Sequence, residues 1–163
     1  MTKIKIRYSF LVFNALLFLL RDGRLISAFY ISCIVHEIGH ILALKLLGGE
    51  LRSVELSCFG IKMTASPCRN IKEGIAVLMC GPAVNLLIFA ILRIFGINGY
   101  ICAFNLAEGI FNLLPFSFLD GGATIELLAE GSVHERAIRL VMTFVKILFI
   151  ILIIILCEYA LIH

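Results

Sequence analysis

The feature that most constrains this sequence is a series of apolar stretches, several of them long enough to cross a membrane as helices. Residues 25–47 would extend about 35 Å at ~1.5 Å per residue, which exceeds the roughly 30 Å hydrocarbon core of a bilayer. Of the 163 residues, 61% are hydrophobic and 15% are charged. A soluble domain of this length cannot bury so much apolar surface, because small folds expose a large share of their area. We therefore expect an α-helical integral membrane protein.

The remaining apolar runs complete the predicted set of membrane segments. They lie at residues 8–20, 74–95, 100–114 and 138–162, and a short helix is expected at 122–130. Together with residues 25–47 they predict about five to six transmembrane segments. The chain has room for a single membrane-embedded domain, residues 1–163, without an appended soluble module.

Residues 50–64 follow a different period from the helical runs. Val54 and Leu56 alternate with polar residues, and Ile61 and Met63 do the same after Phe59-Gly60. Alternation with a period of two is typical of β-strands that have one apolar face. A small β-hairpin is therefore expected directly after the helix at residues 25–47. Its exposed edge could accept a substrate segment as an added strand; the alternative is a plain cytoplasmic hairpin.

Basic residues near the ends of the segments predict the orientation of the chain. A cytoplasmic N-terminus places eight of them inside and three outside; the eight are Lys3, Lys5, Arg7, Lys62, Arg69, Lys72, Arg136 and Arg139, and the three are Arg21, Arg24 and Arg93. The opposite orientation reverses this count, so an internal N-terminus is favoured. The net charge of +3 is small and dispersed, which argues against nucleic acid as a partner.

Within residues 25–47, His36-Glu37-Ile38-Gly39-His40 forms the pattern H-E-x-x-H. Residues four apart share one face of a helix, so His36 and His40 can bind the same metal ion. Glu37 is rotated partly around the helix and can act as a general base without being a ligand. A zinc ion acidifies water, so that Glu37 could remove its proton and the hydroxide could attack a peptide carbonyl. Three such side chains in mid-membrane are costly if unpaired, although a polar cluster between helices is the alternative.

A catalytic zinc site needs a third protein ligand in addition to two histidines. The best candidate is Asp120, which follows an apolar helix and precedes Gly121-Gly122, where the backbone can approach another element closely. The alternative is that Asp120 caps a helix. His134 lies in a polar link and His163 at the end of the sequence, so neither is well placed.

Three motifs in this order resemble the site-2 protease family of intramembrane zinc metalloproteases. The first is H-E-x-G-H; the second, G-P-x-x-N, ends at Asn85; the third is N-x-x-P followed by L-D-G-G, which contains Asn112 and Asp120. The resemblance covers residues 25–131. The compact chain is most similar to the bacterial branch that includes sporulation sigma-factor processing proteases.

The resemblance implies one zinc ion bound by His36, His40 and Asp120, with Glu37 as the residue that activates water. It implies that Asn112 orients the substrate or its oxyanion, on a motif loop at residues 112–122. Asn85 would do similar work or satisfy backbone groups left open near Pro82. The family often has a second proline before L-D-G-G and a basic residue or histidine after it, and this sequence has neither. These departures concern loop rigidity and substrate preference.

The family also implies a membrane-associated protein substrate and leaves room for a regulatory membrane partner; the sequence does not define the oligomeric state. We expect a bacterial cytoplasmic membrane, with the active site nearer the cytoplasmic side. Two other functions remain open: a membrane zinc protease of another family, with Glu126 or Glu130 as third ligand, and a metal carrier or inactive scaffold.

One further polar face is predicted on the helix that precedes the motif loop. Asn105, Glu108 and Asn112 lie at positions i, i+3 and i+7 and share one side of that helix. They could line a wet path to the zinc. Alternatively, Glu108 pairs with Lys146 of the last segment.

Overall fold

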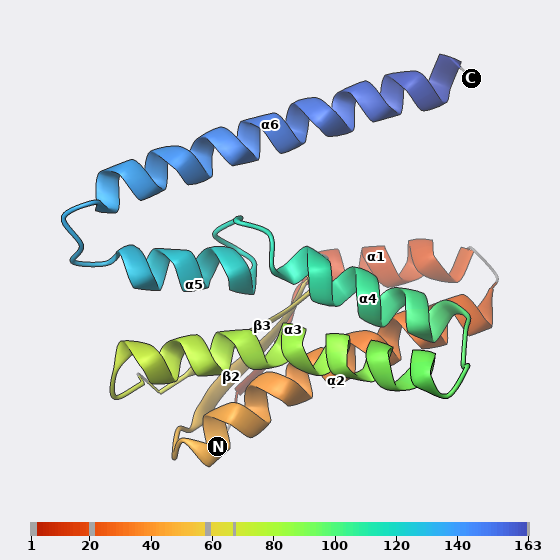
Figure 1. The fold of residues 1–163 in the computed structure, drawn as a ribbon. Helices are drawn as coiled ribbons and strands as arrows, with labels where there is room; N and C mark the ends of the chain where they lie inside the picture. The colour runs from red at the N-terminus through yellow and green to blue at the C-terminus, as the bar shows by residue number, and fades with distance from the viewer. Residues whose placement is uncertain (1–2, 20–21, 58–59, 67, 163) are drawn as a thin grey trace.

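The computed structural model describes residues 3–19, 22–57, 60–66 and 68–162, and it is dominated by helices (Figure 1). In chain order, the elements are β1 (Lys3–Ile6), α1 (Tyr8–Leu19), α2 (Gly23–Leu46), β2 (Leu51–Ser57), β3 (Gly60–Ala65), α3 (Ile71–Ile94), α4 (Tyr100–Asn112), α5 (Asp120–Ala129) and α6 (Glu135–Ile162). The α-helical class and the hairpin after the helix that carries H-E-x-x-H are confirmed.

Local side-chain signals determine where the two central helices begin. The Asp22 carboxylate accepts hydrogen bonds from the backbone N–H groups of Arg24 and Leu25, both at 3.1 Å, and thereby caps α2. Asn70 caps α3 by accepting from the N–H of Glu73 at 2.9 Å. Such caps satisfy N–H groups that have no partner within the helix. Both helices are thus fixed at their starts by residues adjacent to the apolar runs.

Fewer helices reach membrane-spanning length than predicted. By length and composition, three of the described helices could cross a bilayer: α2, α3 and the part of α6 from Glu135 to Tyr159. Helix α1 is apolar but has 12 residues, and α4 has 13, so each extends about 20 Å or less. The predicted number of five to six segments is therefore too high. Apolar character predicted α1 and α4 correctly as helices but did not determine their lengths.

The sheet contains one strand more than the hairpin predicted. Strand β1 pairs with β2 in parallel, and β2 pairs with β3 antiparallel, giving the order β1-β2-β3. The register aligns Ile4, Val54 and Met63 on one face, whereas Lys5 and Glu55 lie on the other. The sheet is therefore amphipathic. The alternation in residues 3–6 was interpreted as a basic flank rather than a strand.

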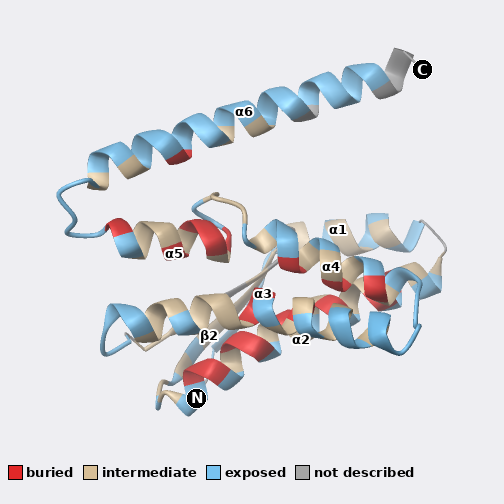
Figure 2. Ribbon diagram, viewed as in Figure 1, coloured by how far each residue is buried: buried red, intermediate tan, exposed pale blue. Residues whose placement is uncertain are grey.

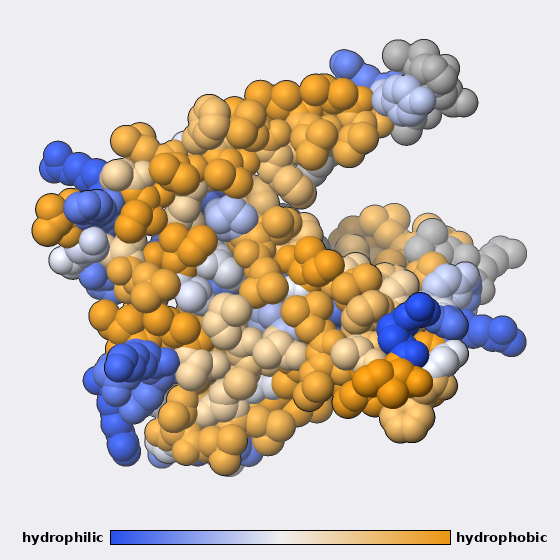
Figure 3. Space-filling view, in the orientation of Figure 1, coloured by the Kyte–Doolittle hydropathy of each residue, from blue (hydrophilic) through white to orange (hydrophobic). Residues whose placement is uncertain are grey.

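Helices α2, α3 and α4 pack against one another and form the centre of the molecule, and α5 packs on α3 (Figure 1). Figure 2 shows buried residues gathered on α2, α4 and the start of α5, whereas α6 is almost entirely exposed. In Figure 3 the surface is apolar over most of its area, and hydrophilic residues gather at two opposite ends. This distribution is the one expected for helices surrounded by lipid along their length.

Candidate metal centre

The two histidines of H-E-x-x-H lie on the buried face of α2, one turn apart. His36 is 5% exposed and His40 7%, and their Nε2 atoms are 3.0 Å from each other. Because His36 and His40 are four residues apart, both rings lie on one side of the helix, as expected. Each imidazole therefore presents a nitrogen to the same point in space.

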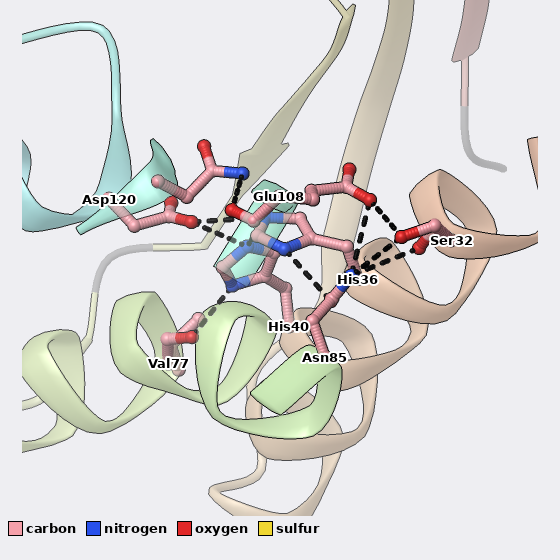
Figure 4. A network of polar contacts seen from close by, with 8 residues as sticks. Ser32, His36, His40, Val77, Asn85, Glu108 and Asp120 are labelled. Atoms are coloured by element: carbon pink, nitrogen blue, oxygen red, sulfur yellow. Dashed lines mark hydrogen bonds and ion pairs between the residues drawn. The ribbon is translucent and has the colours of Figure 1, made fainter. Parts of the chain in front are cut away.

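Asp120, the first residue of α5, reaches this point from the opposite side (Figure 4). Its Oδ2 atom lies 3.1 Å from the Nε2 atom of His36 and 3.2 Å from that of His40. Among the described residues, these three form the one group of histidine, cysteine and acidic side chains that could hold a metal ion, with ligand atoms within 4.8 Å of one another. Glu126 and Glu130, the alternative third ligands, are not part of it.

The contacts of the two Nδ1 atoms show that the proton of each neutral ring is on Nδ1, so that Nε2 is free of a proton. His40 Nδ1 lies 2.8 Å from the carbonyl oxygen of Val77, and a carbonyl can only accept, so this nitrogen carries the proton. His36 Nδ1 lies 3.2 Å from Oδ1 of Asn85. In the neutral rings both Nε2 atoms are then acceptors. Two such nitrogens and a carboxylate oxygen facing one another would repel, and a divalent cation between them removes that repulsion.

Four glycines allow the segments around this cluster to approach one another closely. A Cβ atom at Gly39 would lie 2.7 Å from the carbonyl oxygen of Cys80, and one at Gly81 would overlap the His40 ring. A Cβ atom at Gly121 or Gly122 would overlap the backbone of Leu113 or Phe116. The glycines therefore let α3 lie directly against the histidines and let the loop after α4 fold onto the start of α5. This close packing places Asp120 beside α2.

The cluster opens into a cavity of about 650 Å³ that is lined mainly by apolar side chains. Glu37 and Asn112 line it together with the three candidate ligands, and so does Glu108. Strand β3 contributes Ile61 and Met63, so the apolar face of the sheet forms part of the wall. A peptide in this cavity would meet both the metal-binding cluster and the Glu37 carboxylate.

The two predicted asparagines lie in different surroundings. Asn112 faces the cavity, and its Nδ2 donates to the backbone oxygen of Glu108 at 3.1 Å. Asn85 is fully buried and is not among the residues of the cavity wall. Its side chain contacts His36, Ser32 and Glu108 instead.

The predicted polar face of α4 is only partly brought together at the site. Asn105 is fully buried, donates to the backbone oxygen of Ile101 at 2.8 Å and does not line the cavity. The alternative pairing of Glu108 with Lys146 is wrong, because Lys146 donates to Ser117 at 2.8 Å and Glu108 accepts from Ser32 and Asn85. Sequence reasoning missed Ser32, although it lies one helical turn before His36 and therefore on the same face.

Comparison with known proteins finds a similar sequence and a similar fold. No family model matches the sequence. A curated relative from Synechocystis sp., named "Putative zinc metalloprotease sll0528", is 34% identical over an alignment of 109 residues, and the match covers 60% of this chain and 29% of the relative. The chain thus spans less than a third of that protein. The solved site-2 protease from Methanocaldococcus jannaschii matches 99% of this chain and 83% of its own with a TM-score of 0.73, at 20% identity. The resemblance to site-2 proteases is confirmed in the fold, and part of the sequence is similar to a putative zinc metalloprotease.

Proposed function

We propose that this chain is an intramembrane zinc metalloprotease that hydrolyses a peptide bond in or near a membrane segment of a protein substrate. The observation that carries the proposal is the convergence of His36, His40 and Asp120 within a bundle of apolar helices, on the wall of a cavity that Glu37 shares. The fold likeness to a site-2 protease and the metalloprotease name of a partial relative support it.

In this proposal, His36, His40 and Asp120 hold one zinc ion. Zinc bound there would act as a Lewis acid towards water and the substrate carbonyl. The donor set suits it, because two imidazoles and one carboxylate leave a coordination position open, as in catalytic rather than structural zinc sites. The three ligands come from two segments 80 or more positions apart in sequence, so the site requires the folded bundle.

Glu37 and Asn112 supply the remaining groups that touch the substrate. Glu37 lines the cavity one residue after His36 and would take a proton from water and return it to the leaving amine. Asn112 uses one N–H of its amide on the Glu108 backbone oxygen, so its second N–H is available to a substrate oxygen. Asn85 is fully buried away from the cavity wall, and we assign it to orienting His36 rather than to the substrate.

Strand β3 provides a means of holding the substrate in an extended form. A helical substrate must unwind before its carbonyl is accessible, and its freed backbone groups then need partners. Within the described residues, β3 pairs with β2 on one side and is the edge of the sheet. Ile61 and Met63 place this strand beside the cavity. A substrate segment added to β3 would have its backbone satisfied next to the metal centre.

We further propose that the N-terminus faces the cytoplasm of a bacterial cell and that the chain lies in the cytoplasmic membrane. The hydrophilic ends in Figure 3 fit helices that run between two water interfaces. The basic residues are concentrated near the end of α2 and the starts of α3 and α6. These ends lie on the side of the molecule where α5 also lies (Figure 1), so the metal centre would be nearer the cytoplasm.

The decisive experiment compares membrane-protein fragments from cells that express the wild-type chain or Glu37→Gln. We expect fragments that depend on Glu37, with a loss of cleavage of about 10²–10⁴-fold in the variant, as is typical when a general base is removed. The purified variant should still bind one zinc ion per chain. Fragment patterns that do not differ would contradict the protease assignment. Zinc transport by both forms would support the metal carrier instead.

A further inference from the structure

A half-buried carboxylate on the cavity wall, which has no part in metal binding or catalysis as described above, connects three helices beside the candidate metal centre. Glu108 on α4 accepts hydrogen bonds at Oε2 from the Ser32 hydroxyl of α2, at 2.5 Å, and from Nδ2 of Asn85 on α3, at 3.1 Å. Figure 4 shows these side chains beside His36. Ser32 and Asn85 are completely buried. The contacts therefore join α2, α3 and α4 in the interior of the bundle.

These contacts determine which end of the Asn85 amide faces His36. The Nδ2 group donates both to Glu108 and to Ser32 Oγ, at 3.0 Å, which leaves Oδ1 directed at His36 Nδ1. If the amide were reversed, its oxygen would face the carboxylate oxygen and its N–H group would face the protonated ring nitrogen. Both contacts would be repulsive, so Glu108 selects one of the two amide orientations, together with the backbone oxygen of Ser32, which accepts from Nδ2 at 3.4 Å.

We propose that Glu108 is a positioning residue for the metal site: through Asn85 it holds His36 so that Nε2 faces the metal. The proposal rests on the metal centre assigned above. Removing the carboxylate would leave the Asn85 amide held by Ser32 alone, so the tautomer and ring orientation of His36 would be less firmly fixed. Outer hydrogen-bond partners of this kind usually change metal affinity by about 10–100-fold.

The energetics of the bundle support a functional reason for this carboxylate. An acidic side chain between apolar helices is costly, and an apolar residue of similar size would pack there at lower cost. No ion pair of Glu108 occurs among the described residues, and the hydrogen-bond donors that face it are the uncharged side chains of Ser32, Asn85 and Cys33. Such a cost is accounted for if the carboxylate orients the Asn85 amide.

The test measures zinc affinity, by competition with a chelator, and the absorption spectrum of the cobalt-loaded protein. Glu108→Leu should weaken zinc binding about tenfold and alter the cobalt spectrum, because His36 is less firmly fixed. Glu108→Gln keeps an acceptor oxygen and should restore most of the affinity. Asn85→Leu should weaken binding to a similar extent. The double variant should be no weaker than Asn85→Leu alone, because both changes act through the same contact with His36.

Asn105→Leu is the matched control, since it replaces a fully buried polar side chain of α4 outside this network, and its zinc affinity should stay within about twofold of wild type. Wild-type affinity in Glu108→Leu, or independent losses that multiply in the double variant, would overturn the proposal. If Glu108→Leu does not fold, Glu108→Asp decides: it withdraws the acceptor by one methylene, and unchanged affinity would again refute the role. A wild-type chain that binds no zinc would overturn the metal centre itself, and with it this inference.

Discussion

Helices α2 and α6 both have membrane-spanning length, but they are built for different surroundings. Of the most apolar stretch of α2, 33% is buried inside the protein, whereas the corresponding share for α6 is 6%. Helix α2 carries the histidines and Ser32 on its buried face. Among the described side chains of α6, Met142 is the buried one, and α6 contacts the loop before α5 through Lys146 and Phe149. Polar side chains in the membrane therefore occur where other helices cover them, and lipid alone accounts for the composition of α6.

The difference teaches that the tolerance of a helix to substitution follows from what covers it. On the buried face of α2, a changed side chain meets α3, α4 or Asp120 at the start of α5. Along most of α6, a changed side chain meets lipid, which adapts its shape. We therefore expect substitutions in the central bundle to affect the metal site and those along α6 to have small effects.

The largest effect that this comparison predicts is at Asp120. Asp120→Ala removes one of the three candidate ligands, so zinc binding should weaken by orders of magnitude and proteolysis should be lost. Glu126→Ala, one and a half turns along the same helix, should bind one zinc ion as the wild type does. Metal analysis of both purified variants checks this. Zinc binding that persists in Asp120→Ala and fails in Glu126→Ala would move the third ligand to the distal glutamate.

A smaller but still large effect is expected where α3 approaches the histidines. In Gly81→Ala the new methyl group would overlap the His40 ring, so the ring must move and zinc affinity should fall about tenfold or more. Gly23→Ala is the matched control, because a Cβ atom there meets nothing within 4 Å. It should leave zinc affinity unchanged. Equal zinc affinity in the two variants would show that the close approach of α3 is not needed.

The sequence predicted which three side chains come together at the candidate metal centre, but not the contacts that support them. Spacing within one helix is a local property, so His36, Glu37 and His40 could be assigned from H-E-x-x-H, and Gly121-Gly122 indicated that Asp120 lies near another element. The pairing of β1 with β2 joins Lys3 to Ser53, and the contact of Ser32 with Glu108 joins residues 76 positions apart. Such contacts depend on how helices and strands pack in space, which periodicity does not encode.

The membrane segments show the same limit. Apolar composition predicted α1 and α4 as helices, but the ends of each depend on where its neighbours turn. Helix α4 ends at Asn112, and the N–H groups of Leu113 and Leu114 donate to the carbonyl oxygens three residues back, in the last turn of α4, before the chain turns towards Asp120. Helix α4 is therefore too short to count as a membrane span, because it ends where the loop that carries Asp120 begins.

A third prediction concerns whether substitutions in the sheet impair the protein as substitutions in the central bundle do. Met63→Lys places a charge on the apolar cavity wall, so kcat/KM for a membrane-segment substrate should fall about tenfold while zinc affinity is retained. Thr64→Lys, on the neighbouring exposed position of β3, is the control and should have little effect. If both variants cleave like the wild type, the sheet does not contact the substrate.

The smallest effect is expected on α6, and a pair of identical substitutions compares the two helices directly. Leu44 on α2 is 5% exposed, and Leu148 on α6 is 50% exposed. Leu44→Ala should lower the thermal unfolding midpoint clearly, because truncating a leucine packed against protein costs about 2–5 kcal/mol. Leu148→Ala should change stability by less than ~0.5 kcal/mol, since lipid or detergent fills the space that the side chain leaves. Unfolding of both variants in the same detergent provides the measurement. A loss at Leu148 as large as that at Leu44 would mean that α6 packs against protein along this face, and the contrast between the two helices would then not hold.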